Sequence, residues 1–153
     1  MVRMVTPDDA YTLARLRQAM WDEMSPDKPS NPAFREATFV YWYETLTAGD
    51  AVGWLAEAEY QPIGMALLLL HHHPPRPFGE IRRGYITSVY VAPSHRRQGY
   101  GRALMEQVIA YGREQGLQRL ELRTSTLGRP LYEAMGFRAE EFMLLRLDEG
   151  SKQ

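Results

Sequence analysis

The chain has 153 residues, of which 44% are hydrophobic and 24% are charged, and its formal net charge at pH 7 is -1. This length suits one domain over residues 1–147 with a loose tail at 148–153, and the composition excludes a disordered or fibrous protein. The near-neutral charge argues against non-specific nucleic-acid binding, and the lack of cysteine excludes disulfides, thiolate metal sites and a catalytic cysteine.

No stretch of the sequence resembles a membrane span or a leader. The longest apolar run, residues 65–70, is far shorter than the roughly 20 residues that cross a bilayer, and the N-terminus has no signal-peptide pattern. We therefore expect a cytoplasmic protein without membrane or nucleic-acid partners.

The first third of the chain predicts one short strand and two helices. Residues 1–5 are strand-like, and Thr6-Pro7 is a start signal for a helix that ends at Ser25. A second start signal at 31–32 and a stop at Gly49 predict another helix. The expected apolar stripe of the first helix contains Leu13, Leu16 and Met20, and that of the second contains Phe34, Ala37, Val40, Tyr41 and Leu46.

The middle third predicts three strands. Residues 51–58 and 63–71 are strand-like runs that are separated by four residues, which favours an antiparallel hairpin. Three prolines within 72–79 predict a loop, because proline cannot complete a sheet ladder. The β-branched and aromatic run at 84–91 predicts a central strand.

The last third predicts a helix from about 99 to 116, a strand at 117–124, a short helix at about 130–135 and a final strand at 142–147. The order of elements predicts an α/β fold with a mixed central sheet and helices on both faces. One strand–helix–strand crossover passes through the helix at 99–116.

Glycines and arginines gather just before that helix, in the sequence SHRRQGYGRAL at 94–104. Backbone N–H groups from Gln98 to Gly101 are unpaired donors at a helix N-terminus, which binds anions, and glycine lets an anion approach the main chain. A pyrophosphate fits best, with charge-assisted contacts from Arg96, Arg97 and Arg102. The sequence lacks the Gly-Lys-Ser/Thr ending that a P-loop requires. Leu104 stands where the dinucleotide-binding fingerprint requires glycine or alanine. A glycine turn with solvated arginines is the plainer alternative.

Two motifs resemble the GCN5-related N-acetyltransferase (GNAT) superfamily. VYVAPSHRRQGYGRALM resembles its acyl-CoA-binding motif, with Arg96, Gly99 and Gly101 at the defining positions. LRTSTLGRPLYEAMGF resembles its second signature, through Leu131, Tyr132, Gly136 and Phe137. The likeness covers nearly the whole chain and is greatest to a subgroup of small acetyltransferases. It implies the GNAT-type (acyl-CoA N-acyltransferase) fold and acetyl-CoA as co-substrate.

The resemblance also implies which residues bind acetyl-CoA. The backbone at Val89 and Val91 is expected to pair with the pantetheine amides like an added strand. Ser125 stands where many superfamily members carry asparagine. The expected set is Val89, Tyr90, Val91, Arg96, Arg97, Gln98, Gly99, Tyr100, Gly101, Arg102, Ser125, Gly128, Leu131 and Tyr132.

The expected reaction is acetyl transfer to a primary amine of a small molecule or peptide, by direct attack in a ternary complex, since no cysteine can form an acyl-enzyme. The resemblance makes Tyr132 the general acid that protonates the departing sulfur, and the N–H of Val89 can meet the oxyanion. Many superfamily members place a glutamate near the position of Tyr85. Tyr85 and Glu23 are the two candidates for the general base.

The acceptor and the partners are less defined by the sequence. Aromatic residues at 39 and 41–43, with Asp22 and Glu23, suggest a pocket for a cationic amine. Three consecutive histidines at 71–73 point to alternate sides of an extended segment, so we expect no metal site. Dimers are common in the superfamily, so a homodimer is one prediction. Two other functions stay open, a non-catalytic acyl-CoA sensor and a generic phosphate-binding α/β protein.

Overall fold

A computed structural model describes residues 1–77 and 82–148 of the chain. The chain divides into two compact units, Met1–Arg123 and Thr124–Gln153. The single domain expected from the sequence stays a prediction.

The strands described in the first unit form one mixed sheet in the order β1-β2-β3-β4-β5. Neighbouring strands are antiparallel, except that β4 and β5 run parallel. Because β4 connects to β5 through α3, this pair is the predicted crossover, which is confirmed. The strands are β1 Val2–Met4, β2 Ala51–Ala58, β3 Gln61–His71, β4 Arg83–Val91 and β5 Arg119–Leu122.

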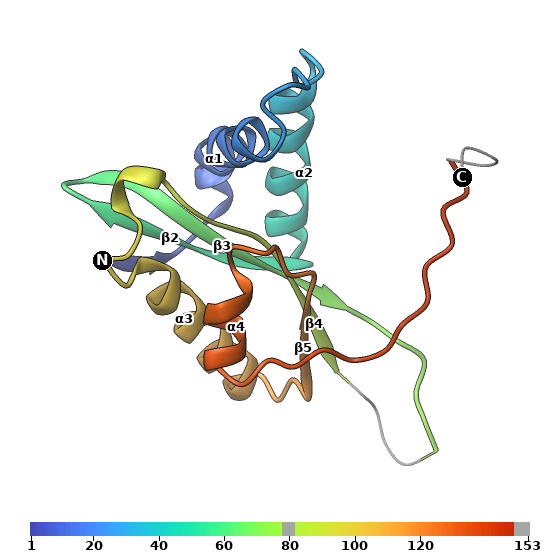
Figure 1. The fold of residues 1–153 in the computed structure, drawn as a ribbon. Helices are drawn as coiled ribbons and strands as arrows, with labels where there is room; N and C mark the ends of the chain where they lie inside the picture. The colour runs from blue at the N-terminus through green and yellow to red at the C-terminus, as the bar shows by residue number, and fades with distance from the viewer. Residues whose placement is uncertain (78–81, 149–153) are drawn as a thin grey trace. The chain divides into compact units, whose positions relative to one another are not determined.

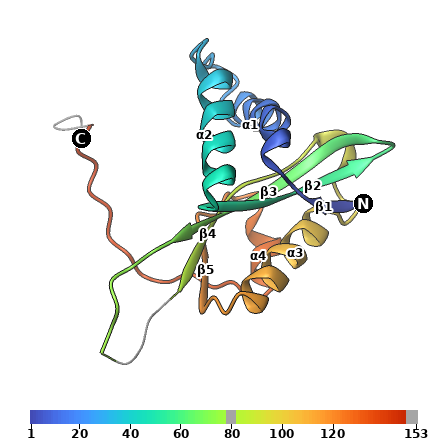
Figure 2. The same cartoon turned by 180° about the vertical axis from the view of Figure 1, so that it is seen from behind.

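Helices cover both faces of this sheet, as predicted (Figure 1). α1 (Ala10–Met24) and α2 (Phe34–Ala48) pack on one face, and α3 (Tyr100–Glu114) packs on the other. The view from behind in Figure 2 shows the same separation. Short 3-10 turns, Pro7–Asp9 and Pro93–His95, precede α1 and α3.

The helix boundaries follow local signals. The Asp9 carboxylate accepts a hydrogen bond from the Thr6 N–H at 2.8 Å, which satisfies a donor at the start of the first helical segment. α2 ends at Gly49, whose φ of +77° is the left-handed conformation that glycine adopts without strain. Leu13 and Leu16 of α1 are buried, which confirms the stripe predicted for that helix.

The apolar stripe predicted for α2 is partly wrong. Thr38 and Trp42 are its buried residues, whereas Val40 and Tyr41 are 40% and 46% exposed. Trp42 is only 2% exposed and lies in the same core cluster as Leu13 and Leu55. Burying this large ring against α1 and the sheet stabilises the fold more than burying the smaller apolar residues of the expected stripe. The helix therefore presents Trp42, and not Val40 or Tyr41, to the core.

The connections of the antiparallel strands agree with the predictions where they are described. Glu59 and Tyr60 form the turn between β2 and β3, with φ of 51° and 65°. Residues 72–75 lie outside any helix or strand, as expected for the proline-rich loop. Positions 78 and 79 of that predicted loop lie outside the described residues.

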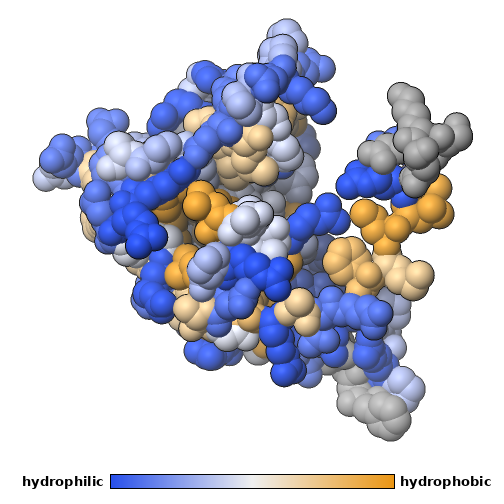
Figure 3. All heavy atoms as spheres, in the orientation of Figure 1, coloured by the Kyte–Doolittle hydropathy of each residue, from blue (hydrophilic) through white to orange (hydrophobic). Residues whose placement is uncertain are grey.

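The second unit contains α4 (Arg129–Ala134), the short helix expected from the sequence. The strand predicted at 142–147 is wrong, because residues 138–147 adopt no regular structure. A strand requires a hydrogen-bonded neighbour, and a run of mostly apolar residues alone does not provide one. Figure 3 shows hydrophobic side chains exposed just before the grey C-terminal residues, and Met143, Leu145 and Leu147 are 96%, 80% and 85% exposed. Of the expected tail, residues 149–153 lie outside the described part.

Candidate functional site

One edge of β4 is open over the second half of the strand. β4 pairs with β5 only from Arg83 to Ile86, because β5 ends at Leu122. Within the described part of the first unit, residues 87–91 therefore pair with β3 alone. Their other backbone groups are available to a ligand that binds like an added strand. This is the segment in which the sequence predicts backbone contacts from Val89 and Val91.

A β-bulge at Ser88 marks the start of the open edge. Ser88 has a φ of 57°, and the register between β3 and β4 shifts between Met65 and Leu67. A bulge changes which side chains point to a given face of the sheet. The Ser88 hydroxyl here accepts a hydrogen bond from Arg17 Nη1 at 2.5 Å, so α1 contacts β4 at the bulge.

The turn that follows β4 presents unpaired backbone donors. Gly99 caps α3 with a φ of +88°, and the Ala103 N–H donates to the Gly99 carbonyl at 3.0 Å. Among the described residues, the N–H groups of 98–102 donate to no protein acceptor. A Cβ at position 99 would have no atom within 4 Å, so the space in front of the turn is open. The arrangement suits a diphosphate bound at the N-terminus of a 15-residue helix.

Two of the three arginines predicted at this turn are free for an anion. Arg97 and Arg102 are exposed, and neither forms an ion pair within the described chain. Arg96 differs, because its Nε donates to the Val91 carbonyl at 2.8 Å and its two Nη atoms donate to the Glu23 carboxylate at 2.6 and 2.8 Å. In this structure Arg96 attaches the turn to the end of α1.

The two candidates for the general base have different surroundings. The hydrogen bonds from Arg96 lower the pKa of Glu23, which makes its carboxylate a weaker base. Tyr85 is on β4 and stacks against His71, with 6.0 Å between ring centroids. Tyr85 lies opposite Leu69 in the antiparallel pair, so its side chain faces α1 and α2. Both residues stay predictions, and the ion pair counts against Glu23.

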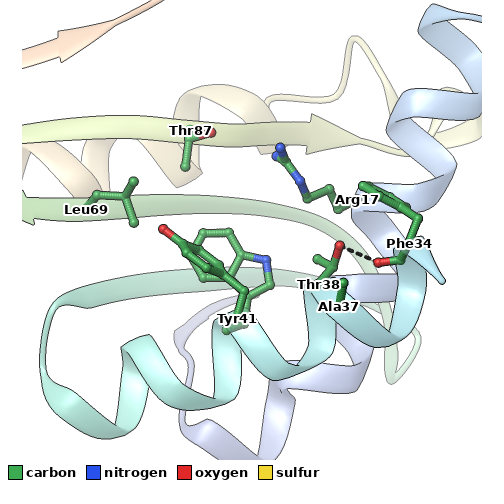
Figure 4. Close-up of a pocket in the computed structure, with 8 residues that line it drawn as sticks. Arg17, Phe34, Ala37, Thr38, Tyr41, Leu69 and Thr87 are labelled. Carbon is green, nitrogen blue, oxygen red and sulfur yellow. Dashed lines mark hydrogen bonds between the residues drawn. The ribbon is translucent and has the colours of Figure 1, made fainter. Parts of the chain in front are cut away.

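A cavity of about 350 Å³ lies between α1, α2 and the sheet, on this same face. Figure 4 shows Arg17 reaching from α1 toward Thr87 on β4, with Tyr41 extending from α2. Trp42 also lines the cavity. Asp22 and Glu23, which suggested a cationic acceptor, do not line it: Asp22 accepts a hydrogen bond from Ser30, and Glu23 is paired with Arg96. The charged side chain at this cavity is an arginine.

In the second unit, Tyr132 on α4 is buried among its local neighbours. Its ring makes an edge contact with Phe137 at 5.9 Å between centroids. A Cβ at Gly128 would lie 2.9 Å from the Tyr132 ring, so glycine allows the close approach. The Ser125 hydroxyl accepts a hydrogen bond from the Gly128 N–H at 3.1 Å. Burial raises the pKa of Tyr132, which keeps its hydroxyl protonated at neutral pH.

The three consecutive histidines, residues 71–73, lie at the end of a strand and in the loop that follows it. His71 closes β3, and His72 and His73 follow it. Residues 1–77 and 82–148 contain no group of three or more acidic, histidine or cysteine side chains arranged to bind a metal ion. In the same part of the chain, no helix has the length and hydropathy needed to cross a bilayer.

Comparison with known families identifies the fold. Residues 13–137 match the family described as "Acetyltransferase (GNAT) family". The chain belongs to the GNAT acetyltransferase family. The resemblance inferred from the two sequence motifs is thereby confirmed.

Individual relatives agree with membership of the GNAT family. A predicted acetyltransferase from Clostridium acetobutylicum, crystallised with acetyl-CoA, is 27% identical with a TM-score of 0.86, covering 99% of this chain and 98% of that one. A GCN5-related N-acetyltransferase from Ralstonia eutropha JMP134 is 31% identical with a TM-score of 0.85, covering 97% and 98%. Glucosamine 6-phosphate N-acetyltransferase of Trypanosoma brucei brucei is 36% identical over 86 residues. That match covers 56% of this chain, which spans about half the length of the curated relative.

Arg17 lines the cavity of this GNAT protein but was not among the site residues predicted from the sequence. Arg17 follows Leu13 by four residues and so lies on the buried stripe of α1, where an arginine interrupts the apolar pattern. That interruption was a signal in the sequence. The bulge at Ser88 and the unpaired indole nitrogen of Trp42 had no such signal.

Proposed function

We propose that the chain is an acetyl-CoA-dependent N-acetyltransferase that transfers the acetyl group to a primary amine of a small molecule or peptide. The observation that carries this proposal is the open edge of β4 leading directly to the unpaired N–H groups of residues 98–102. An extended pantetheine arm and a pyrophosphate need these two features in this order.

The chemistry starts from a neutral amine. For an acceptor with a pKa of about 10.4, only about one molecule in two to three thousand is neutral at pH 7, so a group that removes a proton accelerates the reaction. Of the two candidates we favour Tyr85 as the general base, because the Glu23 carboxylate is paired with Arg96 and is therefore a weaker base. A water-mediated route from the amine to the Tyr85 hydroxyl is part of the proposal.

Attack of the amine on the thioester carbonyl creates an oxyanion and then a thiolate. The backbone N–H of Val89, next to the bulge at Ser88, is the proposed donor to the oxyanion. Tyr132 is the proposed proton donor to the sulfur. A tyrosine hydroxyl, with an ordinary pKa of about 10, is protonated at neutral pH, and burial raises the pKa of Tyr132 further, which makes it a weaker acid. A thiol pKa of about 8.5 makes the leaving group only moderately basic, so a weak acid suffices.

The test is the release of free CoA from acetyl-CoA across a panel of primary amines, with the acetylated product identified by mass. The panel includes glucosamine 6-phosphate, because a relative is named for acetylating it. Acceptor-dependent release supports the proposal. Tight CoA binding with slow thioester hydrolysis that no amine accelerates would instead indicate an acyl-CoA sensor. Equal binding of ATP and desulfo-CoA would indicate a generic phosphate site.

A further inference from the structure

The cavity between α1, α2 and the sheet contains one charged side chain among the residues that line it, Arg17. Its guanidinium donates one hydrogen bond, to the Ser88 hydroxyl, and lies 5.9 Å from the centre of the Trp21 ring. Within the described chain no carboxylate pairs with it. Arg17 is half-buried, and this burial lowers its pKa. A guanidinium held partly out of water without a counter-ion is costly unless a ligand supplies one.

A second donor at the same cavity has no hydrogen-bond acceptor at all. The indole Nε1 of Trp42 is buried and has no hydrogen-bond partner. Most buried polar groups in proteins are hydrogen-bonded, so an orphan donor calls for an explanation. Trp42 and Arg17 come from different helices and line one cavity, and both can only donate. Their shared complement is a group with several acceptor oxygens and a negative charge.

The position of the cavity connects it to the proposed reaction. Thr87 lines the cavity, and Ser88 accepts the hydrogen bond from Arg17. The next residue is Val89, the proposed oxyanion donor. Figure 4 shows the Arg17 guanidinium pointing toward the strand that bears Thr87, while the ring of Tyr41 extends from α2. A molecule in the cavity can therefore place one end at Arg17 and extend an amine toward the open edge of β4.

We propose that the acceptor amine of this enzyme carries an oxyanion, a carboxylate or a phosphate, which Arg17 and the Trp42 indole N–H bind in the cavity. The inference rests on the proposed acetyltransferase function and names the substrate class. It replaces the cationic acceptor suggested by Asp22 and Glu23, since neither carboxylate lines the cavity. The volume of about 350 Å³ suits a metabolite-sized acceptor better than a folded protein.

The first arm of the test compares matched acceptors in the full-length protein. 4-Aminobutyrate is compared with butylamine, and 2-aminoethyl phosphate with ethanolamine, by CoA release at saturating acetyl-CoA. The member with the oxyanion should have a kcat/KM at least about 10-fold higher, and the better of the two anions distinguishes carboxylate from phosphate. Equal rates within both pairs would overturn the inference and leave the acetyltransferase function intact.

The second arm uses Arg17→Gln, with Arg15→Gln as the matched control. Both substitutions remove one positive charge from α1, but Arg15 is exposed and does not line the cavity. Arg17→Gln should lower kcat/KM for the anionic acceptor by about 10- to 100-fold, chiefly through KM, and lower the value for butylamine by a clearly smaller factor. Arg15→Gln should change neither. A loss of the same size with butylamine would assign Arg17 a structural role and contradict the inference.

The third arm requires no catalysis. Butyrate or methyl phosphate is titrated into protein labelled with 15N, and the indole N–H resonances are followed, with that of Trp42 assigned by its loss in Trp42→Phe. A saturable shift of the Trp42 resonance that is absent in Arg17→Gln supports anion binding. If the shift occurs but no amine is acetylated, the proposed function fails and the anion site stands. If Trp42 does not shift while amines are acetylated, the anion site fails and the function stands.

Discussion

Arg96, in the turn before α3, forms a two-pronged ion pair with Glu23 near the end of α1, across 73 positions of sequence. Each residue had a separate functional prediction, the arginine for the pyrophosphate and the glutamate for the general base. The structure makes each the partner of the other. Through this pair and the Arg96–Val91 hydrogen bond, α1 and the end of β4 hold the turn that presents the free N–H groups.

This pair predicts a defined pH dependence of stability. The pKa of Glu23 is lowered from its ordinary value of 4.5 by Arg96. The contribution of the pair is therefore complete above that value and is lost as the pH falls through the lower folded pKa. Glu23→Gln should lower Tm by at most about 4 °C at pH 7, since an exposed pair contributes about 1 kcal/mol or less.

The control for this pair is Asp22→Asn, which removes a neighbouring carboxylate that accepts a hydrogen bond from Ser30 and has no ion pair within the described residues. It should have a smaller effect at pH 7. Melting curves for the parent and both variants at pH 7 and about pH 3 provide the measurement. A difference between parent and Glu23→Gln that persists undiminished at the lower pH contradicts the assignment.

Gly99→Ala tests the anion site through the backbone. The added methyl group meets no atom within 4 Å, so the substitution acts through the backbone conformation. At a φ of +88°, an alanine is less stable than a glycine by about 1–2 kcal/mol. Relief of that strain moves the N–H groups of the turn, and CoA affinity by calorimetry should fall at least about 10-fold. Gly49→Ala, with a φ of +77° and equally open space at the end of α2, should cost similar stability and leave CoA affinity unchanged.

Tyr132→Phe tests the proposed general acid. It removes the hydroxyl and keeps the ring that contacts Phe137, so folding and CoA binding should be preserved. Turnover should fall by up to about 100-fold, because a thiolate is a moderately good leaving group without protonation. Tyr60→Phe, at a fully exposed position of the β2–β3 turn, serves as the control. Full turnover in Tyr132→Phe would remove this residue from the mechanism.

Tyr85→Phe tests the proposed general base. Proton removal by the enzyme matters most at neutral pH, where the acceptor is protonated, and little near the pKa of the amine. The loss of kcat/KM should therefore be largest near pH 7 and shrink as the pH rises. The phenyl ring retains the stacking on His71, so packing is preserved. A loss that is independent of pH, or no loss, argues against Tyr85 as the base.

We also propose that the chain forms a homodimer and that exposed apolar residues at 142–147 contribute to its contact. Met143, Leu145 and Leu147 are highly exposed and lie close together in the chain. Monomeric proteins rarely expose such a group of apolar side chains. Leu145→Lys should lower the mass measured by light scattering from that of a dimer to that of a monomer. Tyr60→Lys, which changes a side chain that is 96% exposed in the first unit, should not. A monomeric parent protein would refute the proposal.

Much of the fold was predictable because the signals that define it are local. The strand expected at 51–58 is Ala51–Ala58 in the structure, and Gly49, which was expected to stop the second helix, ends α2 with a φ of 77°. The last strand was predicted wrongly for the opposite reason. The mostly apolar run at 142–147 can pair as a strand, but whether a partner strand is present is not a property of that segment.

The amino-acid sequence alone indicated the GNAT family, the order of elements as far as α4 and the turn at 98–101, because these depend on residues close together in the chain. Only the tertiary structure decided that Arg96 pairs with Glu23, that Trp42 of α2 is buried in the core, and that Arg17 is the charged side chain at the cavity. Each depends on how helices pack against a bulged strand far away in sequence. The burial of a charge or an indole N–H therefore becomes visible only when the surrounding elements are in place.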